Sequence, residues 1–337
     1  MKSIYLEAPR SIRIAEIAEP RPQAGFAMLR IRAVSICGSD VGAYRGHNIL
    51  VTYPRVIGHE AAAEILEIGS NEQGLRAGDH VVLEPYIYCG ECYPCSIGKT
   101  NCCERLEVIG VHRDGAMVER FAHPVRLLRK IPKDLPWQLA VLAEPLTIAL
   151  HSIHQGRVSA GETVTITGAG PIGLLTAMVA LHYKAVPILV DVLDQRLDFA
   201  ASLGIEHRIN PLKEKVPERI RALSGDLSRV VIEASGSNQA IKDAFDSVCY
   251  AGRIVFTGWP KTSTELPTSL ITKKELELRG SRNSVGDFDE SIELIRSAAV
   301  DVGAIISKSV AFEELPQAVI DQSEMPERFL KIVSVIS

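Results

Sequence analysis

The 337-residue chain has no block of like charge and no long apolar run. Its formal net charge is -4, with 37 Lys and Arg against 41 Asp and Glu. Phosphate backbones and anionic lipid head groups therefore find no basic face, so we expect neither nucleic acid nor membrane as a partner. No apolar run approaches the roughly 18 residues of a membrane span. The start, "MKSIYLEAPRSIRIAEIAEP", has no apolar signal core, so we expect a cytoplasmic protein.

The length and composition favour two domains. A chain of 337 residues is long for one hydrophobic core, and 46% hydrophobic with 23% charged residues is ordinary for a soluble globular protein. In a reducing cytoplasm, clustered cysteines are more often metal ligands or redox groups than structural disulfides.

The stretch "YCGECYPCSIGKTNCC", from Tyr88 to Cys103, has few apolar side chains and holds five of the seven cysteines. Its spacing, C-x2-C-x2-C-x7-C, selects Cys89, Cys92, Cys95 and Cys103. Four thiolates are typical of a closed, structural zinc site. An iron-sulfur cluster is the alternative, and the compartment argues against a disulfide knot. A bound metal would offset the ordering entropy of this loop.

Two further cysteines, Cys102 and Cys249, are not interpreted as metal ligands. Cys102 is interpreted as a bystander, because adjacent residues seldom both ligate one metal. Cys249, in the expected helix "NQAIKDAFDSVCY", is interpreted as a small buried apolar residue.

A second set of candidate ligands lies elsewhere in the chain. "SICGSD" supplies Cys37, and "YPRVIGHE" supplies His59 and Glu60. Each alone has an ordinary structural interpretation, but beside a four-cysteine lobe they indicate a catalytic zinc, which takes about three protein ligands and keeps one position open. Glu144, in the apolar "LAEPLTIALH", needs a metal or a donor as a partner and is a further candidate.

A glycine-rich turn follows a predicted strand in the middle of the chain. In "TVTITGAGPIGLLTAMVAL", Gly168, Gly170 and Gly173 have G-x-G-x-x-G spacing, and Pro171 and Ile172 start the helix. This context predicts a Rossmann turn that binds the pyrophosphate of a dinucleotide.

The next strand, "VPILVD", ends at Asp191. A carboxylate there accepts hydrogen bonds from the adenosine ribose and repels a 2'-phosphate, so NAD is favoured over NADP. Arg196 is the nearby residue that softens this choice.

Strand and helix patterns then alternate as in a doubly wound parallel sheet. "RVVIEASG" and "GRIVFTG" are predicted strands, and ligands lie outside the carboxyl ends of such strands. We therefore expect Ser235 and Gly258 to approach the cofactor, although simple turns also explain the glycines.

These motifs, in this order and at these separations, resemble those of the zinc-containing medium-chain dehydrogenases over essentially the whole chain. The sorbitol and threonine dehydrogenase branch is the most similar. "YRGHN", "CYPCSIGK", "GVHRDG" and "GSRN" resemble the bacterial starvation-sensing dehydrogenase and the hexonate 5-dehydrogenases.

The resemblance implies an α/β protein with a GroES-like β-barrel catalytic domain and a doubly wound Rossmann domain. The catalytic domain would span residues 1–146 and 283–337 with a zinc lobe at 88–103, and the NAD-binding domain residues 147–282. Two zinc ions per chain, one catalytic and one structural, are implied together with NAD. The active site would lie in the cleft between the domains.

The resemblance also gives roles to individual residues. Ser39 would pass the alcohol proton outward, and Arg282 with Asn283 would lie near the nicotinamide. Many relatives carry a histidine at the place of Gly42, so His47 or an ordered water is the expected stand-in. Glu60 and Glu144 would complete or exchange in the shell of the catalytic zinc.

The resemblance predicts oxidation of a secondary alcohol on a six-carbon sugar acid, L-gulonate first and L-idonate or L-galactonate next. A polyol dehydrogenase is the alternative, and a non-catalytic NAD(H)-binding sensor is a third interpretation. The substrate carboxylate needs a cation or donor, for which the candidates are Arg45, Arg113, Arg282, His47 and His112. A homodimer or homotetramer is expected, with "GRIVFTG" as a sheet edge.

Overall fold

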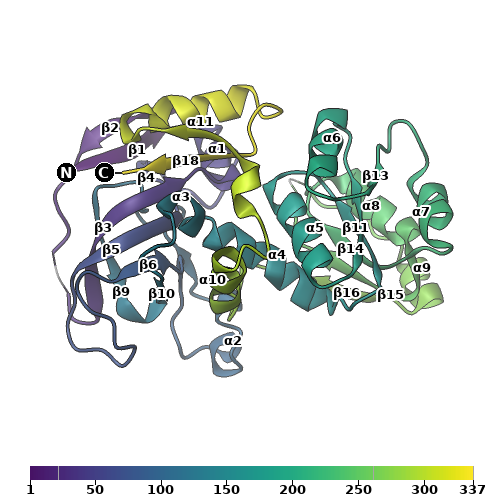
Figure 1. Ribbon diagram of the computed structural model, residues 1–337, viewed down its shortest axis with the longest axis horizontal. Helices are drawn as coiled ribbons and strands as arrows, with labels where there is room; N and C mark the ends of the chain where they lie inside the picture. The colour runs from purple at the N-terminus through teal and green to yellow at the C-terminus, as the bar shows by residue number, and fades with distance from the viewer. Residues whose placement is uncertain (22, 261, 337) are drawn as a thin grey trace. The chain divides into compact units, whose positions relative to one another are not determined.

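A computed structural model describes residues 1–21, 23–260 and 262–336. It separates into two compact units, Met1–Glu144 with Phe288–Ser337, and Pro145–Asp287. The first, here called the split unit, takes both ends of the chain, as the purple and yellow ribbons in Figure 1 show. Among the described residues, no helix has the length and apolar character needed to cross a membrane.

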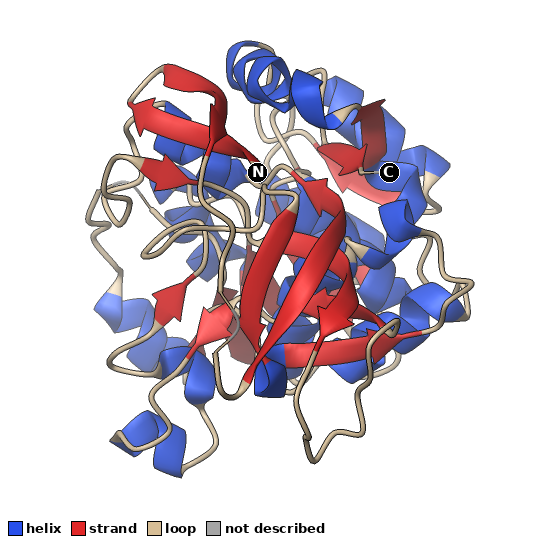
Figure 2. Ribbon diagram, turned by 90° about the vertical axis from the view of Figure 1, so that its left-hand side faces the viewer, coloured by secondary structure: helices blue, strands red, loops and turns tan. Residues whose placement is uncertain are grey.

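The split unit is built mainly of strands, drawn in red in Figure 2. Its largest sheet has seven strands, ordered β10-β6-β5-β3-β18-β17 with β9 paired to β3, beside a three-stranded sheet β2-β1-β4 and the pair β7-β8. The strands are β1 (Lys2–Ala8), β2 (Ser11–Glu16), β3 (Phe26–Ser35), β4 (Arg55–Val56), β5 (Glu60–Glu67), β6 (His80–Leu83), β7 (Tyr86–Ile87), β8 (Glu107–Val108), β9 (Arg120–Pro124), β10 (Leu128–Ile131), β17 (Ile306–Val310) and β18 (Lys331–Val335).

Short helices connect these strands. They are α1 (Gly38–Tyr44), α2 (Tyr93–Ser96), α3 (Trp137–Ala140), α10 (Phe288–Arg296) and α11 (Leu315–Glu324), with 3-10 turns η1 (Thr100–Cys102), η2 (Val125–Leu127), η3 (Val302–Ile305) and η4 (Phe312–Glu314). Helix α4 (Ala143–Gly156) begins in the split unit and continues into the other unit.

The hydrophobic core of the split unit gathers side chains from both ends of the sequence. Leu29 and Ile31 of β3 pack in one cluster with Leu315 of α11 and Ile332 of β18, and all four are fully buried. Strand β3 pairs with β18 on one side and with β5 on the other, so only β3 separates the C-terminal strand from β5. This order determines which side chains meet at the end of the sheet.

The second unit, Pro145–Asp287, has a six-stranded sheet in which every pair of neighbours is parallel. Its order is β13-β12-β11-β14-β15-β16. The chain starts at β11 and adds β12 and β13 on one side, and it then adds β14, β15 and β16 on the other side of β11. The strands are β11 (Thr163–Thr167), β12 (Val186–Val190), β13 (His207–Ile209), β14 (Ser228–Glu233), β15 (Val248–Phe256) and β16 (Glu277–Gly280). The helices between them are α5 (Pro171–His182), α6 (Asp194–Ser202), α7 (Val216–Ser224), α8 (Asn238–Ser247) and α9 (Thr268–Lys274).

Two expectations about this unit are wrong. The strand containing "GRIVFTG" is not a sheet edge, because β15 pairs with β14 on one side and β16 on the other. Helix α8 ends at Ser247, so Cys249 lies in β15 and not in a helix, although it is buried as expected. The β-branched Val248 fits the start of a strand better than the end of a helix. The apolar residues before it have helical spacing, and this spacing made the helix seem to continue to Cys249.

Candidate active site and metal centres

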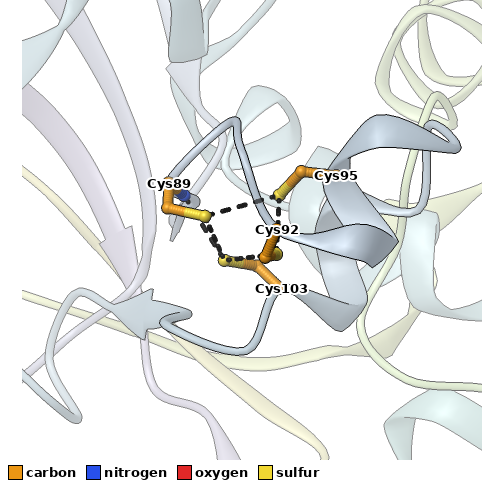
Figure 3. Close-up of side chains that lie close together, drawn as sticks. All are labelled: Cys89, Cys92, Cys95 and Cys103. Carbon is orange, nitrogen blue, oxygen red and sulfur yellow. Dashed lines mark hydrogen bonds between the residues drawn. The ribbon is translucent and has the colours of Figure 1, made fainter.

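Four cysteine sulfurs of the split unit lie at the separations that one zinc ion requires. The Sγ–Sγ distances are 3.5 Å for Cys92 to Cys95 and for Cys89 to Cys103, 3.8 Å for Cys92 to Cys103 and 3.9 Å for Cys89 to Cys95. A tetrahedral ion with Zn–S bonds of about 2.3 Å puts its sulfurs about 3.8 Å apart. Figure 3 shows all four sulfurs turned toward one another, so these residues fit a structural zinc.

Backbone donors also point at this sulfur cluster. The N–H groups of Cys89 and Arg105 both donate to Cys103 Sγ at 3.3 Å. Backbone hydrogen bonds from Glu91 and Cys92 lower the pKa of Cys89 to about 5. Donors of this kind favour thiolates, which are the form that binds metal. Cys102 is exposed and lies outside the cluster.

The second candidate centre joins Cys37, His59 and Glu60, whose possible ligand atoms all lie within 4.8 Å of one another. Cys37 follows β3, and Glu60 is the first residue of β5. Ser39 Oγ lies 3.4 Å from Nε2 of His59. One soft sulfur, one imidazole and one carboxylate are a donor set that suits zinc with an open position.

Asp40 holds the two loops of this centre together. Its Oδ2 accepts the N–H of Cys37 at 2.9 Å, which caps helix α1, and its Oδ1 accepts the N–H of Gly58 at 3.2 Å. Oδ1 also lies 3.9 Å from His59 Nδ1. That separation is too long for a hydrogen bond, so Asp40 acts on the ring of His59 through its charge. An acidic residue three positions after the N-cap residue is a sequence signal for the contact between the Asp40 carboxylate and the backbone N–H of Cys37.

Gly58, directly before His59, has no acceptable replacement by a larger residue. Its φ is +97°, and a Cβ there would lie 2.5 Å from Cγ of Met117. The glycine therefore lets the chain turn His59 toward Cys37 while packing closely on Met117.

Glu60 of β5 is held by one partner on β3 and one on β18. Ser35 Oγ donates to its Oε2, and Lys331 Nζ donates to both of its carboxylate oxygens. The register explains the meeting, because Ser35 pairs with Glu60 and with Val333, two residues beyond Lys331. Lys331 also donates to the carbonyl oxygen of Ile36 at 3.2 Å.

Glu144 lies in the first turn of α4, where Tyr86 donates its hydroxyl to Oε1. Burial raises the pKa of Glu144 to about 7, although the neighbouring His59 opposes that shift. Glu144 is not within the tight Cys37, His59 and Glu60 group. It acts on His59 through its charge, since Glu144 is among the groups that raise the pKa of His59.

Neighbouring acidic groups raise the pKa values of both His59 and Lys331. Burial by itself lowers the pKa of His59, but the sulfur of Cys37, Asp40 and Glu144 together raise it well above the usual value. Burial likewise lowers the pKa of Lys331, while Glu60 and Cys37 raise it. The acidic groups around His59 and Lys331 therefore favour positive charge at this centre.

The predicted glycine turn lies between β11 and α5. A Cβ at Gly173 would lie 1.7 Å from the carbonyl oxygen of Gly168, so helix α5 packs on the turn more closely than any other residue allows. Gly170 is the N-cap, Pro171 and Ile172 are the first helical residues, and the helix N-terminus favours an anion.

Asp191 and Arg196 both contact this turn. Asp191 accepts the N–H of Ala169 at 2.6 Å and the N–H of Leu193 at 2.9 Å. Arg196 Nη1 donates to the carbonyl oxygen of Ala169 at 3.3 Å. The sequence-predicted carboxylate and cation thus lie at one end of the dinucleotide turn.

The remaining predicted residues have varied surroundings. Ser235 and Gly258 follow β14 and β15, and Arg282 and Asn283 follow β16. Among candidates for the substrate carboxylate, Arg45 Nε donates to Ser323 Oγ at 2.9 Å, and Arg113 is paired with Glu107. His112 Nδ1 accepts the N–H of Val108 at 3.0 Å. These three side chains are therefore engaged by the protein itself.

Sequence reasoning missed Ser35, Asp40, Tyr86 and Lys331 at the metal centre. Lys331 begins an apolar strand near the C-terminus, and no spacing connects it with residues 35 to 60. Its signal was a lysine at a position where the strand pattern requires burial, which demands a carboxylate partner.

Comparisons with known proteins agree with this architecture. Residues 23–133 match the family model of the alcohol dehydrogenase GroES-like domain, and residues 171–297 match that of the zinc-binding dehydrogenases. An "uncharacterized zinc-type alcohol dehydrogenase-like protein" of Haemophilus influenzae is 50% identical, with 99% of this chain and 98% of that protein covered. L-galactonate-5-dehydrogenase of Escherichia coli K12 is 32% identical, with 94% of each chain covered.

The crystal structure of an alcohol dehydrogenase (rspB) from Escherichia coli CFT073, complexed with NADH, has a TM-score of 0.93 and 34% identity, with 99% of both chains covered. Fold and site thus define a zinc-type dehydrogenase with a GroES-like domain and a Rossmann domain. The chain belongs to the zinc-containing medium-chain alcohol dehydrogenase family. The predicted family, fold class, enzyme class and cofactors, zinc and a nicotinamide dinucleotide, are confirmed.

Proposed function

We propose that this enzyme oxidises a secondary alcohol of a six-carbon sugar acid with NAD, L-gulonate first and L-idonate or L-galactonate next. The observation that supports this reaction type is that the possible ligand atoms of Cys37, His59 and Glu60 lie within 4.8 Å of one another. The 32% identity to L-galactonate-5-dehydrogenase supports the substrate class.

Cys37 and His59 would hold the catalytic zinc, with Glu60 and Glu144 completing or exchanging in its shell. Bound zinc supplies Lewis acidity, which lowers the pKa of a coordinated hydroxyl group by several units. Asp40 ties the backbone of Cys37 to that of Gly58, which precedes His59, and Lys331 with Ser35 holds Glu60. Cys89, Cys92, Cys95 and Cys103 would hold the structural zinc.

Proton movement in this site depends on Ser39. A neutral secondary alcohol gives up hydride easily only when its proton leaves first or together with it. Ser39 Oγ lies 3.4 Å from His59 Nε2 and can accept that proton and pass it outward. Gly42 offers no side chain for the next step, so His47, which is exposed, is the group to test there.

NAD would be held by the turn from Gly168 to Gly173 and by Asp191, with Ser235, Gly258, Arg282 and Asn283 as further contacts. The carboxylate of Asp191 favours a free ribose hydroxyl over a 2'-phosphate. His47 and Arg282 are both exposed, and they are the first residues to substitute in a search for the group that binds the substrate carboxylate.

Further proposals concern the domain bounds, the oligomeric state and the cellular location of the protein. We infer a catalytic domain of residues 1–146 and 283–337, an NAD-binding domain of residues 147–282, a homodimer or homotetramer, and a cytoplasmic location. Limited proteolysis, sedimentation and cell fractionation test these in turn.

The substrate class is tested by a panel of hexonates and polyols with protein of measured zinc content, followed by NADH absorbance. We expect two zinc ions per chain and the highest kcat/KM with a hexonate oxidised at carbon 5. Turnover of polyols alone would end the sugar-acid proposal. Tight NADH binding without turnover of any alcohol would favour the sensor interpretation.

A further inference from the structure

Glu233, the last residue of β14, is a fully buried carboxylate in the dinucleotide-binding unit. It belongs to neither set of candidate metal ligands, and no sequence motif gives it a role of its own. Since a buried carboxylate requires several donors, its partners show which segments it holds in place.

The side chain of Glu233 collects donors from the segment that follows its own strand. Oε1 accepts the N–H of Ser235 at 2.8 Å and the N–H of Gly236 at 3.0 Å, and Oε2 accepts the N–H of Gly236 at 3.2 Å. The hydroxyl of Ser235 also donates to Oε1. The carboxylate therefore shapes residues 234–237 into a tight turn.

The same residue contacts the ends of both neighbouring strands. Thr167, the last residue of β11, donates its hydroxyl to Oε1 at 3.4 Å. On the other side, the backbone oxygen of Glu233 accepts the N–H groups of Thr257 and Gly258, both at 2.8 Å. A Cβ at Gly258 would lie 2.6 Å from Oε2, so this segment packs directly on the carboxylate.

These contacts reach the glycine turn. A Cβ on Gly168 would lie 3.0 Å from Cβ of Ser235, so the turn that follows β11 touches the segment that Glu233 shapes. All three segments lie at the carboxyl ends of adjacent parallel strands, which is the edge where ligands bind in doubly wound sheets.

We infer that Glu233 is a positioning residue for the dinucleotide: it locks residues 167–168, 234–237 and 257–258 into one arrangement before NAD binds. This inference rests on the proposed NAD-dependent function and deepens it. Preorganised loops lose less entropy on binding, so losing the lock weakens cofactor affinity while zinc chemistry stays intact.

The test is Glu233→Gln in the full-length, zinc-loaded enzyme. The amide keeps the size of the side chain but replaces Oε2, an acceptor, with a donor that faces the N–H of Gly236. We expect the Kd for NADH, from fluorescence titration, and the KM for NAD to rise about tenfold. We expect kcat at saturating NAD and the zinc content to change little.

Glu162→Gln is the matched control, because Glu162 pairs with Arg253 near the amino ends of the same sheet's strands. It should lower stability without changing the Kd for NADH. Equal NADH binding by wild type and Glu233→Gln, or losses matched by Glu162→Gln, would overturn the inference. Wild-type protein that binds no NADH would instead overturn the proposed function and the inference with it.

Glu233→Asp keeps the assay decisive if the glutamine variant does not fold. Aspartate retains the charge but draws the carboxylate back by one methylene, away from Gly236. A rise in the NADH Kd above the wild-type value supports the positioning role, and an unchanged Kd contradicts it.

Discussion

Lys331 and Glu60 lie 271 residues apart in the chain, and Lys331 Nζ donates to both carboxylate oxygens of Glu60. Their side chains are only 3% and 1% exposed. A lone carboxylate at this depth would be strongly disfavoured, so the lysine is what allows Glu60 to lie beside Cys37 and His59. The C-terminal strand β18 is thereby part of the candidate metal centre.

Lys331→Met should destabilise the enzyme stripped of its catalytic zinc by about 3–5 kcal/mol, because it then leaves the buried carboxylate of Glu60 without a cation. Urea denaturation measures this change in the free energy of unfolding. Adding Glu60→Gln to the same chain should recover part of the loss, since no charge then remains unpaired.

The control for this prediction is Lys213→Met. Lys213 pairs with Asp194 at 2.6 Å, but the two side chains are 63% and 51% exposed. Exposed pairs contribute little, so we expect a change of at most about 1 kcal/mol. Equal losses for the Lys331 and Lys213 variants would show that burial of the ion pair has no special effect.

The sequence predicted those parts of the fold and site that depend on local pattern. The strand Thr163–Thr167, the helix after the glycine turn and the carboxylate at the end of the next strand follow from periodicity and spacing within about 30 residues. The four-cysteine lobe is equally local. Lys331, in contrast, reaches Glu60 only through the strand order β5-β3-β18, which pairs both ends of the chain and leaves no mark in local spacing.

Cys95→Ser should remove one of two zinc ions per chain. The lobe from Tyr88 to Cys103 has few buried apolar side chains, so its metal supplies most of its order, and we expect a loss of several kcal/mol of stability. Metal content by mass spectrometry and thermal unfolding measure both effects. Cys102→Ser, at an exposed cysteine outside the cluster, should keep both ions. A Cys95 variant with two zinc ions and full stability would contradict the assignment.

His123 should make the split unit sensitive to acid. It is fully buried on β9, its Nε2 donates to the carbonyl oxygen of Glu84 at 3.0 Å, and burial lowers its pKa to about 4. The unfolded chain binds this proton near pH 6.5 and the folded chain does not. The stabilisation is therefore complete above pH 6.5 and falls as the pH drops toward 4, by about 3 kcal/mol in total.

His123→Gln keeps a donor for Glu84 and removes the titration. Between pH 5 and 7, its free energy of unfolding should fall less steeply with acid than that of the wild type. His182→Gln, at an exposed histidine, is the control and should keep the wild-type slope. Identical slopes for all three proteins would show that His123 does not titrate between the folded and unfolded states.

Asp191 should set the choice between NAD and NADP. Its carboxylate already accepts the N–H groups of Ala169 and Leu193, which fixes it beside the glycine turn, where a 2'-phosphate would meet its charge. Asp191→Ser should raise the ratio of kcat/KM for NADP over NAD by about 100-fold, since it removes both the ribose acceptor and the repulsion. Adding Arg196→Gln should reduce that gain if Arg196, 3.3 Å from the carbonyl oxygen of Ala169, supports the phosphate. A ratio that stays at the wild-type value in Asp191→Ser would mean that the adenosine ribose is read by other residues.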